Sequence, residues 1–208
     1  MKKKIICYGD SNTFGFNSKD GSRYDENTRW TSVLQKNLEN EYEIINEGVC
    51  DRTGFVDNPK GFLYSAQRHF PKMLSKTDEI DLLILWIGTN DLQIQYDIGF
   101  NAVETGLEKL IRLAKGKSKH IIVIPPVILN EKVLEGYFSF QFDETSIGKS
   151  RKIGRIYKKL SNINYCEYFD INKFVNPSDI DGLHYDEKSH KIIGEKLTNY
   201  IQQSLKTV

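Results

Sequence analysis

Short apolar runs alternate along the chain with longer segments in which apolar residues recur at about every third or fourth position. The runs that predict strands cover residues 4–8, 42–45, 81–87, 121–124 and 165–169. The run at 81–87 is apolar at nearly every position, which is typical of a central strand covered on both faces. We therefore expect a mostly parallel five-stranded sheet.

The segments between these runs have the spacing of helices with one apolar face. They include residues 30–40, 102–113, 147–160 and 189–205. The apolar face of the second consists of Ala102, Gly106, Leu107, Leu110, Ile111 and Leu113. This helix joins two predicted strands, so a right-handed β-helix-β crossover is expected. The alternation predicts an α/β fold, a three-layer α/β/α domain.

The length and composition fit one globular domain. The chain has 208 residues, of which 39% are hydrophobic and 27% charged. This is enough for one sizeable core and short for two. The sequence has no internal repeat, low-complexity tract or obvious linker. We treat residues 1–208 as a single domain.

The charge balance argues against polyanionic partners. Lys and Arg total 29 and Asp and Glu total 28, which leaves a net charge of +1 and no general attraction for nucleic acid or anionic membrane. The apolar stretch after Lys2–Lys4 is too short for a signal peptide, and no segment has the length of a membrane span. We expect a cytoplasmic protein that binds neither nucleic acid nor a membrane.

The three cysteines, Cys7, Cys50 and Cys166, lie far apart and in no Cys-x-x-Cys or Cys/His spacing. This pattern argues against a disulfide framework and against a zinc site. We expect at least Cys7 and Cys166 to be small buried apolar residues. No metal ligand set is predicted.

Ser11 is the first candidate for chemistry, because it follows the predicted strand 4–8 through Gly9 and Asp10. The reactive crevice of such sheets lies at the carboxyl ends of the strands. A serine hydroxyl becomes a useful nucleophile only when a nearby base takes its proton. A base must therefore lie elsewhere in the sequence.

The segment Asp181-Gly182-Leu183-His184 can supply that base. A spacing of three residues in a turn can place a carboxylate beside an imidazole, where it fixes the tautomer and stabilises the imidazolium. His190 is a rival, because Glu187 lies three residues before it. We prefer Asp181 and His184 because they precede the predicted last helix.

A third requirement is a set of donors for the oxyanion of the tetrahedral intermediate. Asn90, in Gly88-Thr89-Asn90-Asp91 after the central strand, offers its amide, and Ser11 offers its own N–H. Each motif alone is also typical of an ordinary turn or cap. Their joint occurrence at predicted strand ends is much more specific, and Asp10, Asp91 and Gly88 are expected to support these loops.

These blocks together resemble the SGNH, or GDSL-type, hydrolases over nearly the whole chain. The resemblance implies a flavodoxin-like sheet, Ser11 as nucleophile, His184 as base, Asp181 as its partner and Asn90 as an oxyanion donor. It implies neither metal nor organic cofactor. Further blocks are more similar to the arylesterase and acyltransferase branch; they comprise residues 8–16, Arg29-Trp30-Thr31, residues 46–53 and Pro125-Pro126.

The wider family places a glycine in the second block, where its N–H completes the oxyanion hole. The matching position here is Asp51, and Gly48, three residues earlier, is the alternative donor. A carboxylate beside a developing oxyanion is repulsive, so that of Asp51 must face away. Arg52 is the candidate to neutralise it or turn it outward.

The sequence thus predicts a serine esterase that hydrolyses, or transfers, short acyl groups of a small-molecule ester. A carbohydrate O-deacetylase, acting as acetyl xylan esterases do, is the alternative enzyme. A catalytically silent small-molecule binding protein is the non-enzymatic alternative. A nucleotide-binding domain is disfavoured, because no glycine-rich phosphate loop follows a predicted strand.

The segment 127–142 is long for a connection and rich in aromatic residues. We expect it to form a lid or a subunit contact. The aromatic residues expected as candidate pocket walls are Phe14, Phe16, Trp30, Tyr137, Phe138, Phe140 and Phe142. The resemblance also suggests a homo-oligomer that narrows the site.

Overall fold

Five parallel strands form one sheet in the order β2-β1-β3-β4-β5 in the computed structural model, which describes residues 2–204. The strands are β1 (Lys3–Gly9), β2 (Tyr42–Gly48), β3 (Ile80–Trp86), β4 (Ser118–Ile124) and β5 (Glu167–Tyr168). All neighbouring pairs are parallel. The predicted sheet is therefore confirmed, and it is parallel throughout.

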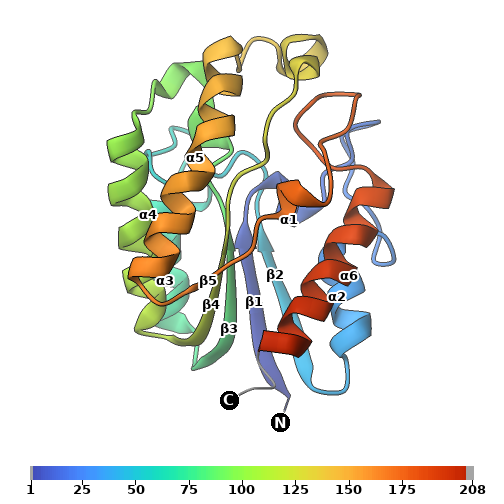
Figure 1. The fold of residues 1–208 in the computed structure, drawn as a ribbon, viewed down its shortest axis with the longest axis vertical. Coiled ribbons are helices and arrows are strands. Elements are labelled where there is room, and N and C mark those ends of the chain that lie inside the picture. Colours follow the sequence, from blue (N-terminus) through green and yellow to red (C-terminus); the bar gives the residue numbers. More distant parts are fainter. Residues whose placement is uncertain (1, 205–208) are drawn as a thin grey trace.

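Helices cover both faces of the sheet, so the predicted three-layer α/β/α architecture is confirmed (Figure 1). On one face lie α2 (Trp30–Leu38) and α6 (Glu187–Ser204), together with the short α1 (Ser11–Phe14). On the other lie α3 (Ala66–Lys76), α4 (Phe100–Lys115) and α5 (Glu144–Ile163). The predicted last helix ran to residue 205, which lies outside the described residues.

Two helices, α1 and α3, were not predicted. In α3, Ala66, Phe70 and Leu74 recur every fourth residue and are all buried, which is the spacing of a helical face. In α4 the predicted inner face is partly wrong, because Ala102 is exposed and Val103 is buried in its place.

Strand β5 is shorter than predicted because it lies at the edge of the sheet and begins late. The chain leaves α5 through Tyr165, which has a positive φ of 54° and is 95% exposed. A left-handed residue cannot continue an extended strand, so pairing with β4 starts only at Glu167.

The register brings the functional loops to one edge of the sheet. Gly9, at the end of β1, pairs with Gly48 of β2 and with Trp86 of β3. All residues of β3 except Asp81 are buried, as expected for a central strand covered on both faces. The segments that follow these three strands therefore start side by side from a rigid base.

Two short 3-10 helices form the middle of the segment 127–142. They are Glu131–Leu134 and Gly136–Phe138. Val133 and Phe142 are buried, whereas Tyr137 and Phe140 are exposed. The segment is thus anchored at both ends and presents aromatic side chains between them.

Over residues 2–204, every helix is too short or too polar to cross a bilayer. The three cysteines are free. Cys7 is buried as predicted, whereas Cys166, like Cys50, is partly exposed.

Candidate active site

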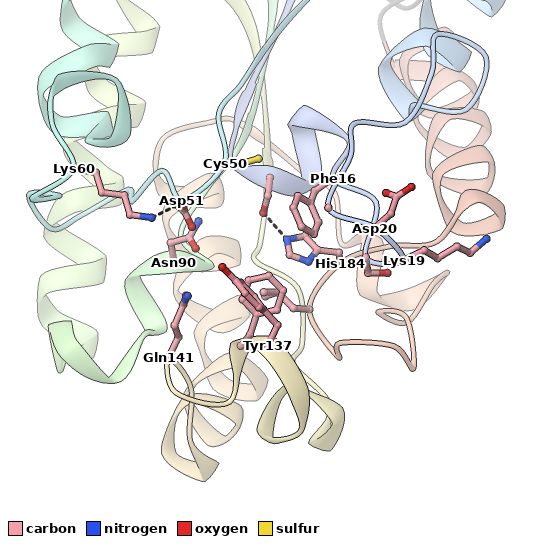
Figure 2. Close-up of a pocket in the computed structure, with 15 residues that line it drawn as sticks. Phe16, Lys19, Asp20, Cys50, Asp51, Lys60, Asn90, Tyr137, Gln141 and His184 are labelled. Atoms are coloured by element: carbon pink, nitrogen blue, oxygen red, sulfur yellow. Dashed lines mark hydrogen bonds and ion pairs between the residues drawn. The ribbon is translucent and has the colours of Figure 1, made fainter.

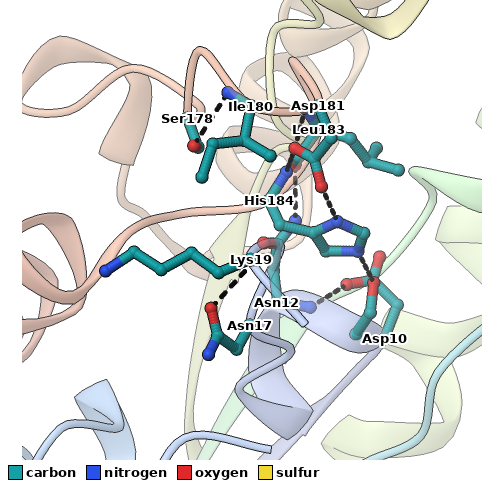
Figure 3. A network of polar contacts seen from close by, with 10 residues as sticks. Asp10, Asn12, Asn17, Lys19, Ser178, Ile180, Asp181, Leu183 and His184 are labelled. Carbon is teal, nitrogen blue, oxygen red and sulfur yellow. Dashed lines mark hydrogen bonds and ion pairs between the residues drawn. The ribbon is translucent and has the colours of Figure 1, made fainter. Parts of the chain in front are cut away.

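Ser11 begins α1, one residue after the end of β1. Asp10 caps this helix, its Oδ1 accepting the N–H of Asn12 at 3.0 Å (Figure 3). A side chain at Gly9 would meet the hydroxyl of Thr13 at 2.1 Å and the carbonyl of Trp86 at 2.4 Å. The glycine therefore lets the chain turn tightly from strand to helix and places Ser11 at the sheet edge.

His184 lies against Ser11, and Asp181 lies behind His184. The distance from His184 Nε2 to Ser11 Oγ is 2.9 Å, and from His184 Nδ1 to Asp181 Oδ2 it is 2.7 Å. An ionised carboxylate only accepts hydrogen bonds, so Nδ1 carries the proton and Nε2 of the neutral ring accepts from the serine. This tautomer is the one that a general base requires.

The turn that carries these residues is held by its own backbone. Asp181 Oδ1 accepts the N–H groups of Leu183 at 3.0 Å and of His184 at 2.9 Å. Gly182 has a φ of +66°, and a side chain there would meet Asn130 Oδ1 at 2.4 Å. Burial acts to raise the pKa of Asp181, but hydrogen bonds and charge from His184 outweigh it and lower that pKa below its ordinary value. The carboxylate therefore stays ionised.

Two aromatic rings cover His184. The ring of Phe16 is 4.3 Å from the imidazole and that of Phe138 is 5.3 Å from it, centroid to centroid. His184 is only 2% exposed as a result. The rings keep water from the imidazole and restrict its orientation.

His190, the rival base, lies away from Ser11. It is fully buried, its Nδ1 accepts the N–H of Trp30 at 3.3 Å, and its ring packs edge-on against Tyr24. Burial lowers the pKa of His190 to about 4. Glu187 pairs with Lys19 instead of His190. The structure therefore brings His184 to Ser11 and leaves His190 as a core residue.

Asn90 follows β3 through a sharp turn at Gly88. Gly88 has a φ of +117°, and a side chain there would meet the hydroxyl of Tyr157 at 2.3 Å; that hydroxyl donates to the carbonyl of Ile87. The Asn90 amide donates one hydrogen to the carbonyl of Arg52 at 3.1 Å. Its second hydrogen remains for the cleft that the residue lines.

Asp51, and not Gly48, presents an unengaged N–H to the cleft. The Gly48 N–H already donates to Asn46 Oδ1 at 2.9 Å, and a side chain at Gly48 would meet the backbone N of Phe14 at 2.2 Å. Gly48 thus allows α1 to pack on β2. Within residues 2–204, the Asp51 N–H has no acceptor, and Asp51 lines the cleft.

The backbone of Asp51 has a φ of 62°, the left-handed conformation that favours glycine. Aspartate tolerates this conformation better than most residues. Two neighbours hold it there: the Asn58 amide donates to the Asp51 carbonyl at 2.8 Å, and Lys60 Nζ binds Asp51 Oδ2 at 2.7 Å. This left-handed position is therefore occupied by an aspartate that Asn58 and Lys60 hold in place.

The expected role of Arg52 is wrong. Its guanidinium is buried beneath the site, donates to the carbonyls of Gly9, Glu47 and Leu63, and stacks on the ring of Tyr8 at 4.4 Å. Arg52 therefore ties β1, β2 and the following loop together. Lys60 is the residue that pairs with the Asp51 carboxylate, nine positions along the chain.

Two further carboxylates are structural. Asp91 is fully buried and accepts the N–H groups of Gly54, Phe55 and Val56. Burial raises its pKa to about 6, against the lowering effect of these hydrogen bonds. Burial likewise raises the pKa of Asp10, the cap of α1. Both hold loops at the sheet edge, and neither lines the cleft.

Ser11 and His184 open into a cleft of about 480 Å³ (Figure 2). Of the candidate aromatic walls, Phe16, Tyr137 and Phe138 line it, whereas Trp30 and Phe142 are buried in the core. The remaining lining is largely polar; it comprises Ser18, Lys19, Asp20, Gly21, Cys50, Asp51, Lys60, Asn90, Gln141 and Leu183. Among the described residues, no group of His, Cys, Asp and Glu side chains is arranged to hold a metal ion.

The site has a serine, a histidine and an aspartate linked in this order, beside N–H donors at the ends of parallel strands. This arrangement defines a hydrolase with a serine nucleophile. Residues 7–192 match the model of the GDSL-like lipase/acylhydrolase family. The chain belongs to this family and is a carboxylic ester hydrolase.

Solved structures of esterases are similar over the whole fold. An M. smegmatis aryl esterase has a TM-score of 0.88 and 25% identity, covering 97% of this chain and 99% of the other. A carbohydrate acetylesterase family member from Sinorhizobium meliloti has a TM-score of 0.88 and 26% identity, covering 97% and 98%. An acetyl-xylooligosaccharide esterase mutant from Geobacillus shares the fold at 19% identity and a TM-score of 0.69, covering 96% and 94%. No curated protein sequence matches the chain.

Proposed function

We propose that the protein hydrolyses esters of short acyl groups through an acyl-enzyme on Ser11. The observation that carries this proposal is the continuous hydrogen-bonded line from Ser11 Oγ through His184 to Asp181. This line ends in a cleft that also presents the Asp51 backbone and the Asn90 amide. The nucleophile, its base and the oxyanion donors thus meet at one point.

Acylation begins when Ser11 Oγ attacks the ester carbonyl carbon and its proton passes to His184 Nε2. Asp181 stabilises the imidazolium formed, because its carboxylate is ionised and already hydrogen-bonded to Nδ1. The carbonyl oxygen becomes an oxyanion, which accepts from the N–H groups of Ser11 and Asp51 and from the Asn90 amide. The intermediate collapses, the bond to the alcohol oxygen breaks, and His184 protonates that oxygen as it leaves.

Deacylation repeats these steps with water. His184 takes a proton from water as it attacks the acyl carbon, and then returns one proton to Ser11 Oγ when the carboxylic acid is released. If an alcohol occupies the place of water, the same acyl-enzyme gives a new ester. Hydrolysis and acyl transfer therefore require the same residues.

A small ester fits the dimensions and lining of the cleft. About 480 Å³ is near the lower end of the range for ligand pockets, and it must hold both the acyl group and the alcohol. Carbohydrate acetates are the second candidate substrate, because the cleft is lined by many polar side chains and similar structures include carbohydrate acetylesterases. The cytoplasmic location and the homo-oligomer stay predictions.

A chain-length series of p-nitrophenyl esters tests the proposal in wild type and Ser11→Ala. We expect the highest kcat/KM on acetate and a decrease of at least about 10⁴-fold in Ser11→Ala. The matched control is Ser75→Ala, an exposed serine near the end of α3, which should retain full activity. Activity that survives Ser11→Ala, or that increases with acyl length, contradicts the proposal.

A further inference from the structure

A second hollow of about 360 Å³ continues the catalytic cleft on the side of the oxyanion donors. Asp51, Lys60, Tyr137 and Gln141 line both spaces. Figure 2 shows these four residues grouped with Asn90, on the side of the cleft away from Lys19 and Asp20. A substrate whose ester lies at Ser11 can therefore extend into the hollow.

The lining of the hollow suits hydroxyl groups on a ring. Gln93, Gln95 and Gln141 contribute primary amides, each able to donate and to accept hydrogen bonds as a hydroxyl group requires. Tyr96 and Tyr137 add aromatic surface, and such a combination of apolar faces with a few polar groups is typical of sites for small ligands.

The charges of the hollow favour an uncharged ligand. Lys60 and Asp51 are its cation and its anion, and they are paired with each other at 2.7 Å. A phosphate or carboxylate group there would meet a cation whose charge Asp51 already balances. A neutral polyhydroxyl compound can instead bind beside the intact pair.

The amides of the hollow are connected to the oxyanion donor by hydrogen bonds. Gln95 Nε2 donates to Gln93 Oε1 at 2.6 Å, and Gln93 Nε2 donates to Asn90 Oδ1 at 3.1 Å. The Asn90 amide in turn donates to the Arg52 carbonyl at 3.1 Å. Gln93 and Asn90 are 6% and 5% exposed. In this series each amide nitrogen donates to the next group along, from Gln95 to the Arg52 carbonyl. The series therefore fixes the Asn90 side chain with its oxygen toward Gln93 and its nitrogen toward Arg52 and the cleft.

We propose that the second hollow binds the hydroxyl groups of a sugar that forms the alcohol part of the ester. Gln95 contacts the sugar, and Gln93 is a positioning residue that holds the Asn90 amide with its N–H toward the oxyanion. Sugar binding in the hollow thereby stabilises the same hydrogen bonds that orient the oxyanion donor. This inference rests on the proposed function and specifies the substrate class of the site.

The first test compares tetra-O-acetylxylose with p-nitrophenyl acetate as substrates of wild type and Gln95→Leu. The measured quantity is the ratio of kcat/KM for the sugar ester to kcat/KM for the aryl ester. Loss of one hydrogen bond to the sugar should lower this ratio about fivefold. The matched control is Gln202→Leu, near the carboxyl end of α6 and outside the lining of both the cleft and the hollow, which should leave the ratio unchanged.

The second test separates positioning from mere structural support by means of Gln93→Glu. An ionised glutamate cannot donate to Asn90 Oδ1, so kcat for both substrates should fall about tenfold at neutral pH. A protonated glutamate can donate again. The kcat of Gln93→Glu relative to wild type should therefore rise as the pH is lowered, whereas for Gln93→Leu this relative kcat should stay low at every pH.

The outcomes distinguish the inference from the proposed function. Aryl ester hydrolysis that depends on Ser11, without hydrolysis of the acetylated sugar, overturns the inference and leaves the proposed function standing. An unchanged ratio in Gln95→Leu, or a pH-independent kcat ratio in Gln93→Glu, also overturns it. If Ser11→Ala hydrolyses both esters as well as wild type does, the proposed function itself is refuted. Thermal melting of each variant shows that these effects arise in folded protein.

Discussion

Replacing Asp181 by asparagine should nearly abolish activity while leaving the fold intact. Asp181 Oδ1 accepts two backbone N–H groups, those of Leu183 and His184. The carbonyl oxygen of asparagine should keep these two bonds, which turns its amide nitrogen toward His184 Nδ1. A donor then faces Nδ1, so the neutral ring must carry its proton on Nε2. In this tautomer the ring cannot accept the proton of Ser11.

The expected decrease in kcat follows from the loss of His184 as the general base. Substitutions that impose the wrong histidine tautomer lower kcat by about 10⁴-fold in serine proteases, equivalent to about 5 kcal/mol of transition-state stabilisation. Asp181→Ala should behave differently, because it leaves two buried N–H groups without an acceptor. We expect it to cost about 2 kcal/mol of stability, or about 4 to 8 °C in Tm for a domain of this size.

The assay is kcat for p-nitrophenyl acetate together with Tm for wild type, Asp181→Asn and Asp181→Ala. The expected pattern is a Tm close to wild type with activity lost in Asp181→Asn, and a lowered Tm in Asp181→Ala. Retention of more than about a tenth of the activity in Asp181→Asn would refute the reasoning about the tautomer. Equal Tm values for the two variants would refute the structural role given to the backbone bonds.

Three further predictions concern residues at the carboxyl edge of the sheet, namely Asn90, Gly48 and Asp91. Asn90→Ala removes one oxyanion donor and should lower kcat by about 10²-fold with KM within about twofold, measured on p-nitrophenyl acetate; an unchanged kcat would contradict the role of Asn90. Gly48→Ala forces a side chain into the backbone of α1 at 2.2 Å and should cost about 1 to 3 kcal/mol in urea unfolding; unaltered stability would be inconsistent with the packing described. Burial raises the pKa of Asp91 to about 6, so the folded state binds the proton more tightly than the unfolded state. The contribution of Asp91 to stability should therefore fall as the pH rises from about 4 to about 6, and comparison with Asp91→Asn across this range isolates it; parallel pH profiles would count against the shift.

The sheet and the line from Ser11 to Asp181 could be predicted from the sequence. Strands β1, β3 and β4 contain nearly continuous apolar runs, as buried parallel strands do. Each chemical motif closely follows a strand or precedes a helix. Because parallel strands end at a common edge, Ser11 and Asn90 could be placed at the same edge; the pairing of β1 with β3 brings them together. The spacing in Asp181-Gly182-Leu183-His184 is local, so a single turn determines it.

Contacts between loops could not be predicted in the same way. The pairing of Asp51 with Lys60 depends on how residues 51–60 fold, and the adjacent Arg52 was the more obvious partner by sequence. The rings of Phe16 and Phe138 reach His184 from distant segments. No periodicity marks such contacts, because they arise only when the connections pack over the sheet edge.

The central claim is that an acyl group is transferred to Ser11, and trapping this intermediate tests it most directly. The enzyme is mixed with excess p-nitrophenyl acetate, quenched in acid within milliseconds, digested and examined by mass spectrometry. The account predicts a burst of p-nitrophenol and a single acetyl group on the peptide that contains Ser11, both absent from Ser11→Ala. An acetyl group on another residue, or steady turnover by Ser11→Ala, would contradict it.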